Sequence, residues 1–151
     1  MICRFFVYGT LTRGECRAIH WPRTPRDVSV AFVRAKLFDL GPYPALWCGD
    51  TDTDGAFDDD SDWVEGEVWT LDDADVEETC RVLDEVEETN QPGLLNQYDR
   101  IVVRAFTKPD GDTSELAFAY QFATRQGLDE SMRIRPIGNS QFARWPDPTR
   151  A

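Results

Sequence analysis

The stretch FFVYGTLTRG, residues 5–14, decides the fold of this chain. It opens with the apolar run Phe5–Val7, which is typical of a strand that starts in a hydrophobic core, and Gly9 comes just past that run. Because glycine has no Cβ, the backbone there can turn sharply and approach another group closely. That group is a phosphate, a carboxylate or another strand, and the rest of the sequence has to distinguish among them.

Strand patterns dominate the remainder of the chain. In residues 63–71, Trp and Glu alternate with Val and Gly, as expected of a half-buried strand. Pro and Asp-Gly within residues 108–112 indicate a hairpin turn between two further strand segments. The strands expected from such patterns cover residues 3–8, 28–40, 63–71, 97–107 and 114–123.

Helical patterns are fewer. Asp72, Asp73 and Asp75 suit a helix N-terminus, and they open a helix expected over residues 73–87. A shorter helix is expected over residues 15–21. Together with the strands, these segments predict a mostly antiparallel, barrel-like α+β domain.

The domain organisation follows from length and pattern. The chain has 151 residues, with neither internal repeats nor an interdomain linker, so we expect a single domain over residues 1–151. Scattered apolar side chains after residue 127 predict that residues 128–151 form a C-terminal tail that packs on this domain.

Charge and cysteine usage restrict the class of protein. The formal net charge of −12 argues against a nucleic-acid partner, because such proteins concentrate Lys and Arg against phosphate. No window approaches the roughly 18 uninterrupted apolar residues of a membrane helix, and the N-terminus leads directly into a strand pattern, so neither a membrane span nor a signal peptide is expected. The cysteines lack C-x-x-C spacing, which favours reduced thiols in a cytoplasmic protein over disulfides or a zinc site.

The helix expected over residues 73–87 carries one anomaly. Val76, Cys80 and Leu83 follow i, i+4, i+7 spacing and mark a buried face, and the next position on that stripe is Glu87. Neighbouring carboxylates, the negative end of the helix and partial burial would each raise the pKa of Glu87 toward the range useful for proton transfer. Two interpretations are open: a catalytic carboxylate, and an ordinary glutamate at a helix end.

Two other segments also leave alternatives. Tyr43 lies between Pro42 and Pro44, which restrict the backbone, so residues 41–46 form either a tight strand connection or a pocket wall. Residues 50–55 copy the first half of a calcium-binding loop, but Ser61 stands where a bidentate glutamate belongs. We therefore expect a solvated, acidic hairpin tip there and no metal site.

Phosphate-binding and histidine chemistry are both disfavoured. The YGTL turn lacks the G-x-x-x-x-G-K-[ST] and G-x-G-x-x-G patterns, and no βαβ unit follows it. His20 is the only histidine, which removes most histidine-based triads and metal sites, and we expect it on the surface.

Five blocks in this order support a resemblance to a known family. They are FVYGTLTRG (6–14), GPYPAL (41–46), VEGEVWTL (64–71), LDEVE (83–87) and YDR (98–100). The series resembles the γ-glutamylcyclotransferase family, particularly its γ-glutamylamine cyclotransferase and AIG2-like branch, over about residues 5–123. The resemblance implies a small β-barrel flanked by helices, no metal or organic cofactor, and conversion of a γ-glutamyl group to 5-oxoproline with release of an amine or amino acid.

The resemblance also implies a site. Glu87 matches the catalytic glutamate, and the match to the substrate-binding turn covers Tyr8, Gly9, Thr10 and Leu11. We add Tyr43 and Tyr98 as candidate substrate-binding residues. Glu88 stands where the family often has glycine, and the link over residues 89–97 is longer than usual.

The chemistry of a γ-glutamyl substrate suits these residue types. Successive backbone N–H groups at a glycine-containing turn bind anions, so residues 9–11 are able to hold the substrate α-carboxylate or to polarise the carbonyl that is attacked. Glu87 would take a proton from the attacking amine and return it to the leaving amine. The competing interpretation is a non-catalytic module that binds a carboxylate-bearing small molecule on the same barrel.

Overall fold

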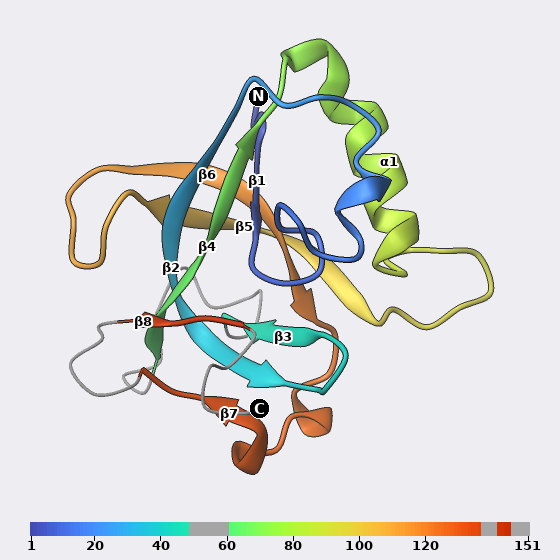
Figure 1. Cartoon of the computed structure of the whole chain (residues 1–151). Helices are drawn as coiled ribbons and strands as arrows, with labels where there is room; N and C mark the ends of the chain where they lie inside the picture. The colour runs from blue at the N-terminus through green and yellow to red at the C-terminus, as the bar shows by residue number, and fades with distance from the viewer. Residues whose placement is uncertain (49–60, 137–141, 146–151) are drawn as a thin grey trace.

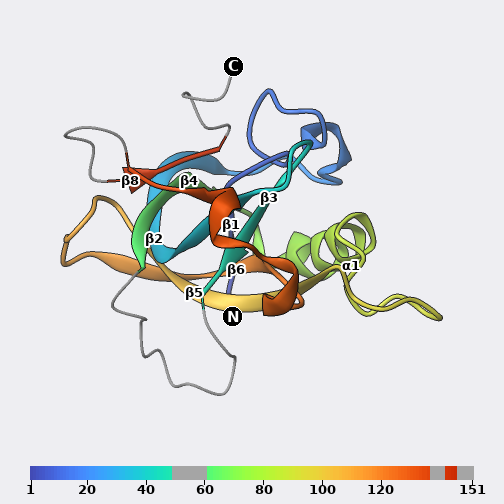
Figure 2. The same ribbon diagram turned by 90° about the horizontal axis from the view of Figure 1, so that it is seen from below.

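The computed structural model describes residues 1–48, 61–136 and 142–145. Five strands close into a barrel in the order β2, β5, β6, β1, β4 and back to β2 (Figure 1). The strands are β1 (Arg4–Val7), β2 (Asp27–Asp39), β3 (Pro44–Trp47), β4 (Asp62–Thr70), β5 (Tyr98–Phe106), β6 (Ser114–Phe122), β7 (Arg133–Ile134) and β8 (Phe142–Ala143). The helix α1 (Val76–Val86) lies outside the ring of strands, as the view from below also shows (Figure 2).

The pairings confirm the mostly antiparallel barrel. Around the ring, only β1 and β6 run parallel, and they meet at Phe5 and Phe118. β2 and β5 also meet at one pair, Phe32 and Phe106. The barrel is therefore two long antiparallel ladders, β2–β4 and β5–β6, that β1 and these short contacts join into a closed ring.

Strand β1 is buried on both faces, which explains its continuous apolar run. Side chains alternate between the two faces of a strand, so Phe6 points into the barrel while Phe5 points outward to the layer beneath α1, where it joins Leu83. β4 approaches β1 so closely that a Cβ at Gly66 would lie 2.4 Å from the carbonyl oxygen of Val7. Glycine is therefore required at that point of β4.

The helical segments are shorter than the sequence predicted. Asp73–Asp75 form a 3-10 turn, α1 begins at Val76, and the Asp75 side chain makes no cap hydrogen bond. The acidic side chains before α1 bind other partners, because Asp72 pairs with Arg26 and Asp75 pairs with Arg23. The segment expected to form a helix over residues 15–21 has a single 3-10 turn, Ala18–His20, and Pro22 follows it.

The chain after β6 returns to the barrel. After two 3-10 turns, Arg125–Gly127 and Glu130–Met132, β7 pairs with β2, and β8 pairs with β4. Leu128 and Ile134 are buried. Within the described residues, no helix is long and apolar enough to cross a membrane.

Candidate active site

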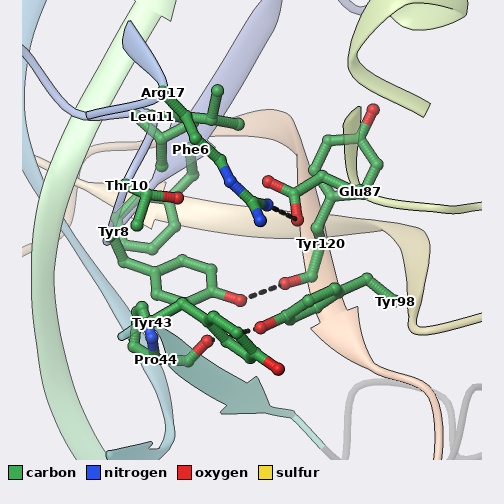
Figure 3. A pocket seen from close by; sticks show the side chains of 12 residues that line it. Phe6, Tyr8, Thr10, Leu11, Arg17, Tyr43, Pro44, Glu87, Tyr98 and Tyr120 are labelled. Atoms are coloured by element: carbon green, nitrogen blue, oxygen red, sulfur yellow. Dashed lines mark hydrogen bonds and ion pairs between the residues drawn. The ribbon is translucent and has the colours of Figure 1, made fainter. Parts of the chain in front are cut away.

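A pocket opens where the chain leaves β1, between the start of β3, the end of α1 and the hairpin β5–β6 (Figure 3). Together with the solvent at its mouth, it encloses about 350 Å³. Its walls are Phe6, Val7, Tyr8, Gly9, Thr10, Leu11, Arg17, Tyr43, Pro44, Glu87, Tyr98 and Tyr120.

Gly9 allows a close approach of β3. A Cβ at this position would lie 2.4 Å from Cγ and 2.6 Å from Cδ of Pro44, well inside contact distance. Thr12 closes the turn, because its N–H and its hydroxyl both donate to the carbonyl oxygen of Gly9, at 3.0 and 2.6 Å. Gly9 was expected to approach a phosphate, a carboxylate or another strand. In the structure it approaches another strand, β3, at Pro44.

The same turn presents unpaired backbone donors. Gly9, Thr10 and Leu11 are buried, and the described part of the chain offers no hydrogen-bond acceptor to their N–H groups. Buried N–H groups in folded proteins almost always have a partner, so three in succession along one pocket wall indicate a place for an anionic or carbonyl oxygen.

The connection between β2 and β3 is both a tight strand connection and a pocket wall, the two alternatives that the sequence left open. It is tight, with the Leu40 N–H donating to the Tyr43 carbonyl oxygen at 3.0 Å and positive φ (96°) at Gly41. It is also a pocket wall, because Tyr43 and Pro44 line the cavity and the Tyr43 ring meets the edge of Tyr98 at a centroid distance of 6.4 Å.

The buried tyrosine hydroxyls hold the walls together. Tyr8 donates to the carbonyl oxygen of Tyr120 and accepts from the Leu46 N–H at 3.3 Å, while Tyr98 donates to the carbonyl oxygen of Pro44 at 2.7 Å. Burial raises the pKa of Tyr8, Tyr98 and Tyr120 above the ordinary value. These phenols therefore stay protonated at neutral pH and do not act as bases.

The end of α1 fixes the position of Glu87. The Thr89 N–H donates to the Asp84 carbonyl oxygen at 2.8 Å and the Glu88 N–H to the Glu85 carbonyl oxygen at 3.2 Å, the two bonds of a Schellman motif. Glu88 takes the left-handed conformation that this motif needs, with φ 52°, and Glu87 is the last residue of the helix turn. Glycine would adopt this conformation without strain, so Glu88 departs here from the glycine that the resemblance implies.

Glu87 is a buried carboxylate on the pocket wall. Burial raises its pKa from 4.5 to about 7, and the guanidinium of Arg17, whose Nη1 lies 3.8 Å from Glu87 Oε2, opposes this rise. The adjacent carboxylates, which the sequence suggested as a cause, do not supply the effect: Asp84 is paired with Arg100, and Glu85 and Glu88 point to solvent. The raised pKa puts Glu87 in the range where a carboxylate both accepts and returns a proton near neutral pH.

A polar network ties α1 to the barrel one turn before Glu87. The Arg100 guanidinium donates twice to the Asp84 carboxylate, at 2.9 and 3.3 Å, and the Tyr120 hydroxyl donates to the same carboxylate at 2.7 Å. Arg100 and Tyr120 are cross-strand partners on β5 and β6. The network therefore anchors the helix that carries Glu87 to the hairpin that forms the opposite wall.

Comparison with known proteins gives the family. The family model described as gamma-glutamyl cyclotransferase, AIG2-like, matches residues 5–138. The chain belongs to this family. No curated protein matches the chain.

Solved structures share the fold of this γ-glutamylcyclotransferase-family chain. An AIG2-like protein from Mus musculus is 20% identical, with a TM-score of 0.53 and 96% of each chain covered. An uncharacterised protein, PH0828, from Pyrococcus horikoshii is 15% identical, with a TM-score of 0.52, covering 89% of this chain and 86% of that one. YkqA from Bacillus subtilis is 21% identical, with a TM-score of 0.52. The match covers 82% of this chain but only 36% of YkqA, so this chain spans about a third of the length of YkqA.

The sequence suggested seven site residues in this family member, and all of them lie along the wall of one pocket. They are Tyr8, Gly9, Thr10, Leu11, Tyr43, Glu87 and Tyr98. Sequence reasoning missed Arg17 and Tyr120. The hairpin register, which places Tyr120 opposite Arg100 of the YDR block, is the signal that could have found Tyr120. No periodicity or motif singles out Arg17.

The remaining sequence expectations concern surfaces away from the pocket. The calcium-like segment, residues 50–55, lies outside the described residues, and Asp62, which follows it, pairs with Arg133 at 3.0 Å. Among the residues that the structure describes, no three His, Cys, Asp or Glu side chains form a metal-binding group. His20 is exposed, and all four cysteines are free thiols.

Proposed function

We propose that this protein is a cyclotransferase that converts a γ-glutamyl amine or a γ-glutamyl amino acid to 5-oxoproline and releases the free amine. The observation that carries the proposal is the pairing of a buried carboxylate, Glu87, whose pKa is about 7, with unpaired N–H groups along the wall formed by residues 9–11. The family membership supports the same reaction class.

Glu87 has two proton transfers to perform. The neutral α-amine of the substrate attacks the γ-carbonyl carbon and forms the ring C–N bond, and Glu87 as general base takes one proton from that nitrogen as the bond forms. When the bond from that carbon to the leaving nitrogen breaks, Glu87 returns the proton to the leaving amine. Atoms balance without water, and no group is oxidised or reduced, so the reaction needs no redox cofactor.

The pocket shape contributes by holding the substrate in a bent conformation. Ring closure is intramolecular, so fixing the α-amine beside the γ-carbonyl removes much of the entropic barrier. The rigid walls made by Tyr8, Tyr98 and Pro44 suit this task, because their hydrogen bonds fix the cavity before substrate enters. As part of the same proposal, the protein acts on a small molecule in the cytoplasm, where its thiols stay reduced.

The test is a panel of γ-glutamyl amines, γ-glutamyl amino acids and glutathione, with 5-oxoproline as the readout. We expect the wild-type protein to act on at least one member and Glu87→Gln to abolish turnover, because glutamine keeps the shape but cannot accept a proton. Glu88→Gln, at the exposed neighbouring position, is the matched control and should retain activity.

Two outcomes would contradict the proposal. If no member of the panel yields 5-oxoproline above a control without protein, while γ-glutamyl compounds bind in calorimetry, the protein is the carboxylate-binding module. If Glu87→Gln keeps a kcat close to that of the wild type, Glu87 is not the proton carrier.

A further inference from the structure

Arg17 is a second charged group on the pocket wall. Among the residues that line the described pocket, Arg17 is the only cation and Glu87 the only carboxylic acid. Arg17 comes from the segment after the YGTL turn, where its N–H donates to the Thr10 carbonyl oxygen at 2.8 Å. This bond fixes the backbone of Arg17 beside the unpaired donors of residues 9–11.

The guanidinium of Arg17 has N–H donors that are not used within the described part of the chain. Its Nη1 lies 3.8 Å from Glu87 Oε2, which is beyond hydrogen-bonding distance, and the described chain offers its side chain no hydrogen-bond acceptor. The guanidinium lies over the Tyr43 ring at 5.9 Å from the centroid, and the side chain is 33% exposed (Figure 3). Arg17 therefore presents a planar, fork-shaped set of N–H donors that packs on the Tyr43 ring and is accessible from solvent.

Such a fork matches a carboxylate. Arginine binds carboxylates through two parallel N–H···O bonds, and a γ-glutamyl substrate always carries an α-carboxylate. When the leaving group is an amino acid, the substrate carries a second carboxylate next to the leaving nitrogen. Both nitrogens must approach Glu87 during the reaction, so either carboxylate comes within reach of a guanidinium that already lies beside Glu87.

We infer that Arg17 is a substrate-binding residue that takes a carboxylate of the γ-glutamyl substrate. The inference rests on the proposed function and assigns to Arg17 a role that the backbone donors of residues 9–11 would otherwise perform alone. It also has a consequence for Glu87, which faces Arg17, Tyr8 and Tyr98. A carboxylate that draws the guanidinium away from Glu87 removes a positive charge that lowers the pKa of Glu87.

The source of the carboxylate decides what the backbone donors do. If Arg17 takes the α-carboxylate, the N–H groups of residues 9–11 are left for the γ-carbonyl oxygen, where negative charge develops. If Arg17 takes the carboxylate of the leaving amino acid, those N–H groups hold the α-carboxylate, and the protein prefers γ-glutamyl amino acids to γ-glutamyl amines.

The experiment compares Arg17→Gln with Arg13→Gln, a matched loss of one exposed arginine from the same segment outside the pocket. Calorimetric titration with 5-oxoproline tests the α-carboxylate alone. Kinetics with γ-glutamyl-alanine and γ-glutamyl-ethylamine, which differ only by the carboxylate of the leaving group, test the second source. Arg17→Lys, which keeps the charge without the fork, is included as a further variant, and circular dichroism checks that each protein is folded.

We expect Arg17→Gln to weaken carboxylate recognition by roughly tenfold to a hundredfold, the range for a hydrogen bond to a charged group, with partial recovery in Arg17→Lys. A loss that affects 5-oxoproline and raises KM equally for both substrates assigns Arg17 to the α-carboxylate. A loss confined to γ-glutamyl-alanine assigns it to the leaving group.

Three results would overturn the inference. They are unchanged affinity and KM in Arg17→Gln for every ligand, an equal loss in Arg13→Gln, and a wild-type protein that binds none of these carboxylates. The titration with 5-oxoproline needs no turnover. A protein that binds this compound through Arg17 without converting any member of the γ-glutamyl panel would therefore refute the proposed function and leave the role of Arg17 standing.

Discussion

Replacing Glu87 by glutamine should stabilise the folded protein above neutral pH. Burial raises the pKa of Glu87 from 4.5 to about 7, a value that already includes the opposing effect of Arg17. The folded state therefore holds the proton more firmly than the unfolded state does. Between pH 4.5 and 7, the unfolded chain releases this proton first, so the free energy of unfolding falls as pH rises.

The size of the effect follows from the difference between the two pKa values. One pKa unit corresponds to about 1.4 kcal/mol, so the difference between 4.5 and about 7 corresponds to roughly 3 kcal/mol once the carboxylate is ionised in both states. Glutamine is neutral at every pH. We therefore expect Glu87→Gln and the wild type to be similarly stable near pH 4.5, and the variant to be more stable by about 3 kcal/mol at pH 8.

Urea unfolding at pH 5, 6, 7 and 8 measures this difference. Other carboxylates titrate equally in both proteins and cancel in the comparison, and Glu88→Gln provides a control at the exposed neighbouring position. A stability difference between Glu87→Gln and the wild type that stays constant from pH 5 to pH 8 would refute the reasoning. If Glu88→Gln gained stability with rising pH as Glu87→Gln is expected to, burial of Glu87 would not be the cause.

Two further predictions concern the backbone on either side of the pocket. Glu88→Gly should raise stability by about 1 kcal/mol with turnover retained, because φ at this position is 52° and a non-glycine residue is strained there; an unchanged melting temperature would argue against that strain. Gly9→Ala should lower stability by about 1–3 kcal/mol, because its Cβ would lie 2.4 Å from Pro44 Cγ, and adding Pro44→Ala should restore part of the loss in urea unfolding. A double variant no more stable than Gly9→Ala would show that Pro44 is not the obstacle.

The sequence by itself determined the five strands of the barrel, the place of the helix α1 and the family. Alternation over residues 63–71 and the turn residues at 108–112 predicted β4 and the β5–β6 hairpin, because period-two burial and turn chemistry are local properties of a chain. The i, i+4, i+7 spacing of apolar residues in α1 pointed to Glu87 as the next position on the buried face, because this periodicity is also a local property of the chain. The order of five short blocks gave the family to which the chain belongs.

Only the tertiary structure decided how these elements create a pocket. Sequence reasoning attributed the raised pKa of Glu87 in part to its neighbours along the chain, yet burial is the cause, and burial depends on what the barrel and the segment after β1 place over the carboxylate. Arg17 has no signal in the sequence, because its approach to Glu87 depends on chain closure between segments far apart. The reason for Gly9 is likewise a contact with Pro44 of another strand, which no local pattern encodes. Periodicity reports which face of an element is buried, whereas the partner on that face is set by the packing of the whole chain.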